Sequence, residues 1–518
     1  MGEQGASSHT AWNELVAAAL IGGEREAVRL PDEGPLGEVL SRLECPSREQ
    51  QLLGAAAILS LYRRAGARPA VETAPPPEPS PAESLSRCPS SVGRYLAEIL
   101  SGTRAELLSE WLDAAAAAGM RAPEELLPAL LDLGAAREGI REKLLPVLGE
   151  RGRWLARHNP DWAYALGPEE AIDWETAPRV ARLALLKRLR ATDPARAREL
   201  LQSTWEQDPP NERAAFIEHL NAGLSMEDEP FLEAALDDKR KEVRTQAAEL
   251  LAKLPQSRLS ARMLERVRPL LSFTPGQPSR VLAFMPGKKP SLQVTLPEAC
   301  DRAMARDGIE AKPPPGMGKK AFWLMQMIAV IPPATWCEMW GTPPQVLIEA
   351  ARETEHHREL LEGWARAAAR HRDREWAEAL LSTSIPSLPE GVAAELVDSL
   401  PPERREAALL PHVQASGNRI PLVPLLAHCQ HAWSEMFTRA VIALVREHVR
   451  GPGYPSDWRI HDALKEFALY AAPALADEAT RTIGGPPGSM QLRSVEQFLD
   501  LLHFRRQMLA AFGDKETR

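Results

Sequence analysis

The sequence predicts an all-α protein, more specifically a HEAT-like α-solenoid with degenerate helical repeats. Amphipathic segments of helix length follow one another through most of the 518 residues, a length too great for one hydrophobic core. Many of the 46 prolines stand singly between these segments, and proline is tolerated at the start of a helix but not in its interior. Strand-like alternation of apolar and polar residues is rare. Short helices stacked as repeats satisfy all three observations.

The clearest repeat is DEPFLEAALDDKRKEVRTQAAELLAKLP, residues 228–255, which predicts two amphipathic helices. The apolar residues of the second helix recur at spacings that place them on one face: Val243, Ala247, Leu250, Leu251 and Leu254. We expect Asp238 to cap the N-terminus of this helix and Pro255 to close it. A helix pair of this kind cannot bury its apolar face alone, so it requires stacked neighbours.

Composition divides the chain into five parts. An N-terminal helical unit is followed by a Pro-rich flexible linker, and two series of helical repeats flank an irregular segment. The predicted boundaries are 1–66 for the helical unit, 67–91 for the linker, 92–270 for the first HEAT-like repeats, 271–318 for the irregular segment and 319–518 for the second repeat region. Within the irregular segment, Arg280–Met285 and Ser291–Leu296 are joined through PGKK and predict a β-hairpin.

Net charge, cysteines and hydropathy indicate a soluble, cytoplasmic protein. A formal net charge of −9 argues against wholesale attraction to nucleic acid or membranes. The five cysteines lie far apart without a C-x-x-C pair, as expected for reduced thiols. No signal peptide is visible at the N-terminus. The longest apolar run, 321–334, contains Gln326 and two prolines and is too short to span a bilayer.

One basic segment departs from this acidic balance. Between Leu236 and Pro290, twelve lysines and arginines face five acidic residues, a local net charge of +7. Arginines recur every four residues on one predicted helix face, after a short basic run, and the predicted partner-binding residues are Lys239, Arg240, Arg258, Arg262 and Arg266. Three interpretations stay open: a solvated face paired with acidic residues of the next repeat, a docking surface for an acidic protein, or a nucleic-acid contact.

Motifs for catalysis or cofactor binding are incomplete. The run PPPGMGKKAFWL lacks the first glycine and the hydroxyl residue of a phosphate-binding loop. It favours a turn at the glycines that leads into a helix, although backbone amides near Lys319 could still attract an anion. His428 and His431 share a predicted helix face while Cys429 points away, which favours a packed or solvated pair over a metal site. The sequence carries no hydrolase or zinc-protease motif. We therefore predict no enzymatic activity, no catalytic residue, no cofactor and no metal site.

Three stretches carry a family resemblance: WNELVAAALIGGER near the N-terminus, the repeat at 228–255, and VTLPEACDRAMARDGIEAKPPPGMGKKAFWLMQMIAVIPPATW. On these stretches the chain resembles an uncharacterised bacterial family, a domain of unknown function with HEAT-like helices, over most of its length outside the linker. The resemblance implies partners rather than chemistry. The family looks like one encoded beside MoxR-type AAA+ ATPases, von Willebrand A-domain proteins and SWIM zinc-finger proteins.

We therefore expect a non-catalytic scaffold or adaptor that binds a protein partner through the solenoid surface. The resemblance suggests an AAA+ ATPase or a von Willebrand A-domain protein as that partner. The alternative is a nucleic-acid-binding HEAT-like solenoid of the DNA-glycosylase type, whose affinity for nucleic acid falls steeply with salt because counterions are released.

Overall fold

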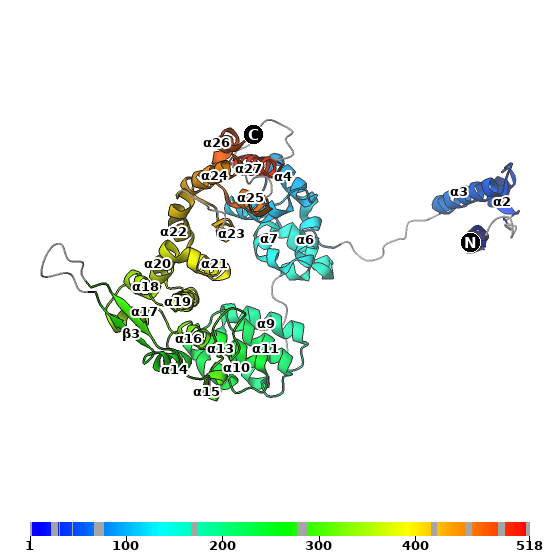
Figure 1. The fold of residues 1–518 in the computed structure, drawn as a ribbon. Coiled ribbons are helices and arrows are strands. Elements are labelled where there is room, and N and C mark those ends of the chain that lie inside the picture. Colours follow the sequence, from blue (N-terminus) through cyan, green and yellow to red (C-terminus); the bar gives the residue numbers. More distant parts are fainter. Residues whose placement is uncertain are drawn as a thin grey trace. The chain divides into compact units, whose positions relative to one another are not determined.

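The chain separates into two compact units, 1–79 and 80–518. The computed structural model (Figure 1) describes residues 3–21, 30, 32–43, 45–66, 77–166, 174–276, 288–415, 422–450, 458–484 and 493–513. None of the helices in these ranges has the length and apolar character needed to cross a membrane.

The first unit is a small helical cluster. Its helices are α1 (Glu3–Ile21), α2 (Gly34–Ser41) and α3 (Arg48–Gly66). Both α1 and α2 pack on α3. The buried side chains at this junction are apolar and come from all three helices: Ala11, Leu15, Leu36, Leu40, Ala55 and Leu59. Burial of these side chains is the main stabilising contribution in so small a unit.

The predicted linker, 67–91, is too long at its C-terminal end. Residues 67–76 lie outside the described part of the chain, but Glu83 is held by the second unit. Its carboxylate accepts hydrogen bonds of 2.8 and 2.9 Å from two backbone N–H groups at the start of α8 (Gly149–His158). A carboxylate at a helix N-terminus satisfies unpaired amides and is favoured by the helix dipole. Composition alone cannot distinguish such an anchored acid from a solvated linker residue.

The second unit is almost entirely helical. It begins with β1 (Ser86–Arg87), α4 (Ser90–Leu100), α5 (Leu108–Ala117), β2 (Met120–Arg121), α6 (Leu127–Ala136), α7 (Arg141–Leu144) and α8. It continues with α9 (Arg179–Thr192), α10 (Pro194–Thr204), α11 (Pro210–His219), α12 (Glu229–Ala235), α13 (Lys241–Leu251), α14 (Arg258–Val267), β3 (Leu271–Thr274), β4 (Ser291–Val294) and α15 (Arg302–Arg306).

The remaining helices complete the unit. They are α16 (Lys319–Ile328), α17 (Ala334–Trp340), α18 (Pro344–Arg352), α19 (His357–His371), α20 (Arg374–Ser384), α21 (Glu390–Ser399), α22 (Pro402–Gln414), α23 (Val423–Ala427), α24 (Glu435–Arg450), α25 (Trp458–Tyr470), α26 (Ala476–Ile483) and α27 (Arg493–Ala511).

Packing in the second half of this unit follows a two-layer rule. Helices α18, α20, α22, α24 and α26 contact one another in sequence, and so do α19, α21, α23, α25 and α27 (Figure 1). Adjacent helices such as α18 and α19, or α19 and α20, pack across the two layers. Each helix pair therefore buries its apolar faces against its neighbours, as in a HEAT-like solenoid. The predicted all-α, solenoid-like fold is confirmed.

The prolines mark helix starts, as the sequence predicts. Pro194, Pro210, Pro344 and Pro402 are the first residues of α10, α11, α18 and α22. At that position a proline removes an N–H group that would have no partner in the helix, and its fixed φ suits helical backbone. Asp193 strengthens one of these starts, because its side chain accepts a 3.0 Å hydrogen bond from the backbone N–H of Arg196.

The repeat at 228–255 forms two helices, α12 and α13, with the predicted apolar face buried. The five predicted core residues, Val243, Ala247, Leu250, Leu251 and Leu254, are all buried. The predicted cap is wrong: Arg240, not Asp238, is the residue before α13, and Asp238 pairs with Arg213 of α11 at 3.2 Å. The helix ends at Leu251, before Pro255.

The β segment pairs differently from the prediction. Strand β4 agrees with the predicted second strand, but its antiparallel partner is β3, with Phe273 opposite Leu292. The predicted first strand, Arg280–Met285, lies outside the described residues. A contact outside the sheet stabilises the position of β3, because the ring centroid of Phe273 lies 5.6 Å from that of Trp340 on α17.

Buried arginines join successive helices of the array. The side chains of Arg190 on α9 and Asp228 before α12 are both 0% exposed, and their charged atoms lie 2.9 Å apart. The same guanidinium donates to the carbonyl oxygens of Leu220 and Ala222. A buried charge is tolerated only with such complete pairing. Arg190 thereby fixes where α9, α11 and α12 meet.

The last helix of the second unit packs against its first two helices. Arg505 of α27 donates two hydrogen bonds, of 2.6 and 2.7 Å, to the carboxylate of Glu110 on α5. Beside this pair the ring of Phe504 packs 5.1 Å from that of Tyr95 on α4. The first and last helices of the unit therefore cover each other, whereas a linear solenoid must cap an exposed face at each end.

Replacing Leu251 by alanine tests the packing of the repeat helix. Leu251 is 0% exposed, so the substitution leaves a cavity, and we expect a loss of about 2–5 kcal/mol in the free energy of unfolding. Urea denaturation followed by circular dichroism measures it. The same change at Leu61, which is 69% exposed on α3, is the matched control. Equal, small effects at both positions would contradict the buried placement of α13.

Candidate functional site

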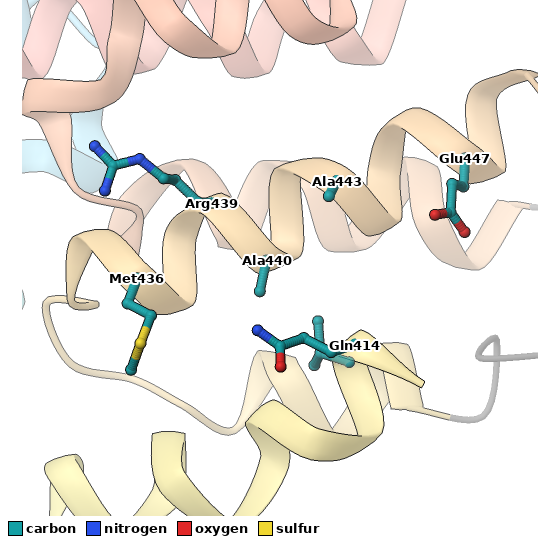
Figure 2. A pocket seen from close by; sticks show the side chains of 7 residues that line it. Gln414, Met436, Arg439, Ala440, Ala443 and Glu447 are labelled. Atoms are coloured by element: carbon teal, nitrogen blue, oxygen red, sulfur yellow. The ribbon is translucent and has the colours of Figure 1, made fainter. Parts of the chain in front are cut away.

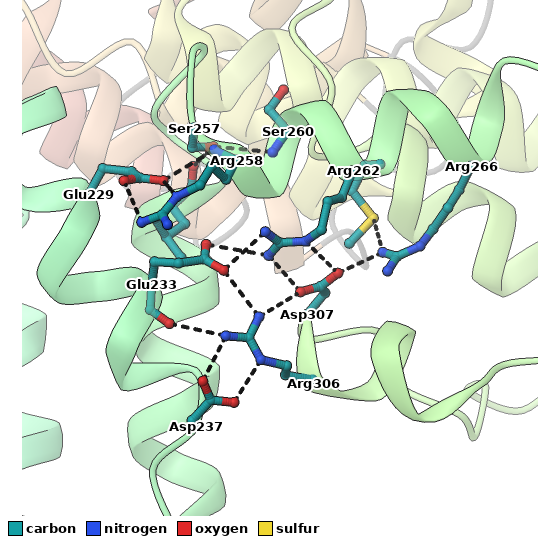
Figure 3. A network of polar contacts seen from close by, with 12 residues as sticks. Glu229, Glu233, Asp237, Ser257, Arg258, Ser260, Arg262, Arg266, Arg306 and Asp307 are labelled. Carbon is teal, nitrogen blue, oxygen red and sulfur yellow. Dashed lines mark hydrogen bonds and ion pairs between the residues drawn. The ribbon is translucent and has the colours of Figure 1, made fainter.

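The three predicted arginines of the basic segment form one row on α14. Arg258, Arg262 and Arg266 follow one another at intervals of one helical turn (Figure 3). The helix is fixed at its start by Ser257, whose hydroxyl accepts a 3.2 Å hydrogen bond from the backbone N–H of Ser260. A serine at this position is a strong N-cap. The row that the spacing predicts is therefore present.

Helix α12 carries carboxylates that meet this row. Arg258 pairs with Glu229 at 2.8 Å, and Arg262 pairs with Glu233 at 3.0 Å. Glu229 and Glu233 are themselves one helical turn apart, so the acidic row matches the spacing of the basic one. The hydrogen bond from Arg258 lowers the pKa of Glu229 below its ordinary value.

Asp307 provides the most buried carboxylate at this site. It follows α15, its side chain is 2% exposed, and it lies 2.7 Å from a nitrogen of Arg262 and 2.7 Å from a nitrogen of Arg266. A carboxylate removed from water needs such paired donors, because burial alone would disfavour its charged form. Asp307 thereby attaches the end of α15 to α14.

Arg306 completes the set. It pairs with Asp237 at 2.7 Å and with Glu233 at 3.1 Å, so it links α15 back to α12. We call this set the charge network: four arginines, Arg258, Arg262, Arg266 and Arg306, and four carboxylates, Glu229, Glu233, Asp237 and Asp307 (Figure 3). Its formal charges cancel.

The charge network removes the main reason for predicting that the arginine row binds a partner. The local excess of positive charge suggested that something negative must meet these arginines, and the protein itself supplies those carboxylates. Lys239 and Arg240, the other two predicted residues, lie with exposed side chains in the turn between α12 and α13, outside the charge network. A partner contact at all five residues stays a prediction, but an unmatched charge no longer motivates it.

The backbone turns sharply directly after Asp307. Gly308 has a φ of +88°, in the left-handed region, and a Cβ placed on it would lie 2.7 Å from the Cβ of Ala248 on α13. Glycine permits both the conformation and this close approach. The charge network and the glycine turn therefore hold the segment that follows, 308–312, close to α13.

A groove opens beside this segment. Helices α13, α16 and α19 and the segment 307–312 line a space of about 890 Å³, which we call the α13–α19 groove. Apolar side chains from α13 and α16 contribute to its lining, among them Ala248, Phe322 and Met325. Five cations also line it: Lys241, Arg244, Lys312, Arg366 and Arg370. Three acids, Glu249, Asp307 and Glu310, share the lining, which leaves a net of two positive charges.

Arg370 is the most unusual of these cations. It is partly buried, and desolvation together with the neighbouring Arg366 lowers its pKa. Its guanidinium donates a 2.7 Å hydrogen bond to the carbonyl oxygen of Ala329, at the C-terminal end of α16. Arg366, in contrast, is paired with Glu362 at 2.8 Å. Among the residues that the structure describes, no carboxylate lies within the 4.0 Å limit of an ion pair with Arg370.

A second, smaller pocket lies between α22 and α24. Its volume is about 400 Å³, and Figure 2 shows Met436, Ala440 and Ala443 along α24 with Gln414 of α22 beside them. Its only arginine, Arg439, is already paired with carboxylates of the protein. This pocket is a gap between consecutive helices of one layer and offers no unpaired charge.

The histidine–cysteine cluster does not converge on one point. His428 lies 3.2 Å from Asp398, and His431 lies 3.1 Å from Glu406, so each histidine has its own carboxylate. Cys429 is buried, and burial raises the pKa of its thiol to about 12. Across the described residues, no group of three histidine, cysteine, aspartate or glutamate side chains could hold a metal ion.

The glycine-rich run before α16 is a helix entry. Gly316 has a φ of +88°, Gly318 precedes α16, and the lysines at positions 319 and 320 begin the helix with exposed side chains. Left-handed backbone at Gly316 explains why glycine is placed there. The geometry is that of the glycine-turned start expected from the sequence.

Comparison with known proteins identifies a family for the chain but does not identify a function. The model of a family of unknown function, DUF5691, matches residues 14–512. No curated protein matches the chain. No solved structure matches it either.

Substituting Asp307 by asparagine tests the charge network. The change leaves Arg262 and Arg266 without their shared carboxylate, so we expect a loss of about 1–3 kcal/mol in the free energy of unfolding. Asp237→Asn is the control within the same network: Asp237 is 65% exposed, and surface pairs contribute about 0–1 kcal/mol. Urea denaturation compares the two. Equal losses in the free energy of unfolding would show that the burial of Asp307 does not add to the stabilising effect of its ion pairs.

Glu229 predicts a pH dependence. Its pKa is lowered in the folded chain from the ordinary 4.5, so the unfolded chain binds more protons, and Glu229 stabilises the fold above its unfolded pKa. This contribution is lost as the pH falls through the folded pKa. Glu229→Gln should therefore destabilise the protein at about pH 7, and the difference from the unsubstituted chain should shrink toward about pH 3. A difference independent of pH in urea denaturation contradicts the ionic role of Glu229.

Proposed function

The chain belongs to the DUF5691 family of unknown function, and we propose that it is a non-catalytic scaffold or adaptor that binds a protein partner through its solenoid surface. The observation that carries the proposal is the α13–α19 groove, in which a helical array presents apolar and cationic side chains together. Stacked helix pairs commonly form extended binding surfaces of this kind. Aromatic, methionine and arginine side chains are also enriched where proteins meet.

A partner of a particular kind follows from the family resemblance. Because the resembling family looks like one encoded beside AAA+ ATPases and von Willebrand A-domain proteins, we propose that a bacterial protein of one of these two kinds is held by the solenoid. We further propose that this happens in the cytoplasm, since the five cysteines carry free thiols in the structure.

The nucleic-acid alternative has lost its main support. It rested on the arginine row of α14, and those arginines are occupied by carboxylates of the charge network. Acidic side chains also stand among the cations of the α13–α19 groove, which disfavours a polyanion. We keep nucleic acid as an outcome of the experiment.

Affinity recovery from an extract of the native host tests the proposed function. We expect the tagged full chain to retain a protein at physiological salt, after nuclease treatment, and to form with it a complex of defined mass in size-exclusion chromatography with light scattering. Mass spectrometry identifies the partner, and the reciprocal capture checks it. Recovery that disappears with nuclease, or material bound only at low salt, contradicts the protein-adaptor function.

A further inference from the structure

We propose that the α13–α19 groove binds an acidic, partly apolar, extended segment of the partner protein. The inference rests on the proposed function, because it names the class of chain segment that the adaptor recognises. Four observations support it: the size of the groove, the balance of its charges, its apolar lining and the state of Arg370.

The size of the groove suits a chain segment. A space of about 890 Å³ lies within the range of roughly 300–1,000 Å³ found for ligand-binding clefts. A single ion or water molecule would leave most of it unfilled. Most of the lining comes from four parts of the chain, namely α13, the segment 307–312, α16 and α19, and Leu259 of α14 and Ala305 of α15 complete it. A ligand in the groove can therefore contact all four at once.

The charges of the groove favour discrete carboxylates. Asp307 is already bound by Arg262 and Arg266, and Glu310 lies 3.6 Å from Lys241. Arg366 is paired with Glu362, whereas Arg244, Lys312 and Arg370 have no carboxylate partner within ion-pair distance in the described part of the chain. Acids interspersed with cations repel a uniform polyanion but leave separate positions where single carboxylates fit.

The apolar lining adds a second requirement. Ala248, Ala252 and Ala329 are small and leave room, whereas Phe322 and Met325, 8% and 5% exposed, present the edges of larger apolar side chains. Methionine adapts its shape to different neighbours, so the lining can adjust to an apolar side chain. A ligand with leucine or phenylalanine between its acidic residues can bury apolar surface here, which a free phosphate or a purely acidic chain cannot do.

Arg370 gives the groove its strongest anchor for a carboxylate. A guanidinium has five N–H donors, and only the one to Ala329 is satisfied by the described residues. A carboxylate can accept two parallel bonds from such a group, and attraction is stronger where water is excluded. Capping of α16 explains the bond to Ala329, but that role leaves the other donors of Arg370 for a ligand.

Selection from a displayed library of random dodecapeptides on the immobilised full chain tests this proposal. We expect enriched peptides with several aspartates or glutamates and with leucine or phenylalanine between them. One enriched peptide, labelled with fluorescein, then reports affinity by anisotropy at physiological salt. A labelled dodecathymidine oligonucleotide is measured beside it.

Three variants address the groove. Lys241→Glu with Lys312→Glu reverses two exposed rim charges, Thr245→Trp fills the groove without changing its charge, and Arg370→Lys keeps the charge but removes the bidentate donor pair. We expect roughly tenfold or greater weakening of peptide binding in each. Arg196→Glu, an exposed charge reversal on α10 outside the groove, is the control and should leave the affinity unchanged. Circular dichroism confirms folding of every variant.

Several results overturn the proposal. They are the failure of any acidic peptide to be enriched, affinity that all three folded variants retain, and tighter binding of the oligonucleotide than of the peptide. Failure of this proposal can be distinguished from failure of the adaptor function. If the unsubstituted chain and the Thr245→Trp variant recover a partner equally well, the protein is still an adaptor, but the groove is not its docking site.

Discussion

The buried carboxylate of Asp307 is the contact on which the central part of the second unit depends. A charge with its side chain 2% exposed must be paired, and Arg262 and Arg266 provide that pairing across 2.7 Å each. The pairing places the end of α15 on α14, and Gly308 then turns the backbone against α13. One wall of the α13–α19 groove consists of the residues that follow. The arginines predicted as partner-binding residues thus hold in place one wall of the groove that we propose as a docking site.

The same chemistry recurs along the array. Arg182 pairs with Asp208 at 2.7 Å, Arg190 with Asp228 at 2.9 Å, and Arg505 with Glu110 at 2.6 Å. Guanidinium groups suit this task because their planar donors bind a carboxylate through two parallel bonds. In a stacked array each helix contacts mainly its neighbours, so pairs of this kind fix the relative positions of successive helices. A local count of positive residues is therefore a poor guide to surface charge here.

The sequence predicted features that depend on neighbouring residues, and it missed contacts between residues that are distant in the sequence. Proline positions and helical periodicity identified the helices and the buried face of α13, because both depend on neighbouring residues. The acidic row at Glu229, Glu233 and Asp237 has the same four-residue spacing as the arginine row and could have been noticed. The pairing of Glu229 and Glu233 with arginines 29 positions away, and of Asp237 with one 69 positions away, shows no local signal. The partner of β4, the anchoring of Glu83 and the groove itself all join segments distant in sequence, so periodicity could not reveal them.

A double-mutant cycle between Arg262 and Asp307 most directly tests the claim that the arginine row stabilises the fold through ion pairs within the protein. The free energies of unfolding of Arg262→Met, Asp307→Asn, the double variant and the unsubstituted chain are compared in urea. Contacting residues of one network couple by about 0.5–3 kcal/mol, and a value in that range, with both single variants destabilised, is the predicted result. Additive effects within about 0.3 kcal/mol, with Arg262→Met as stable as the unsubstituted chain, would mean that the row is free surface after all.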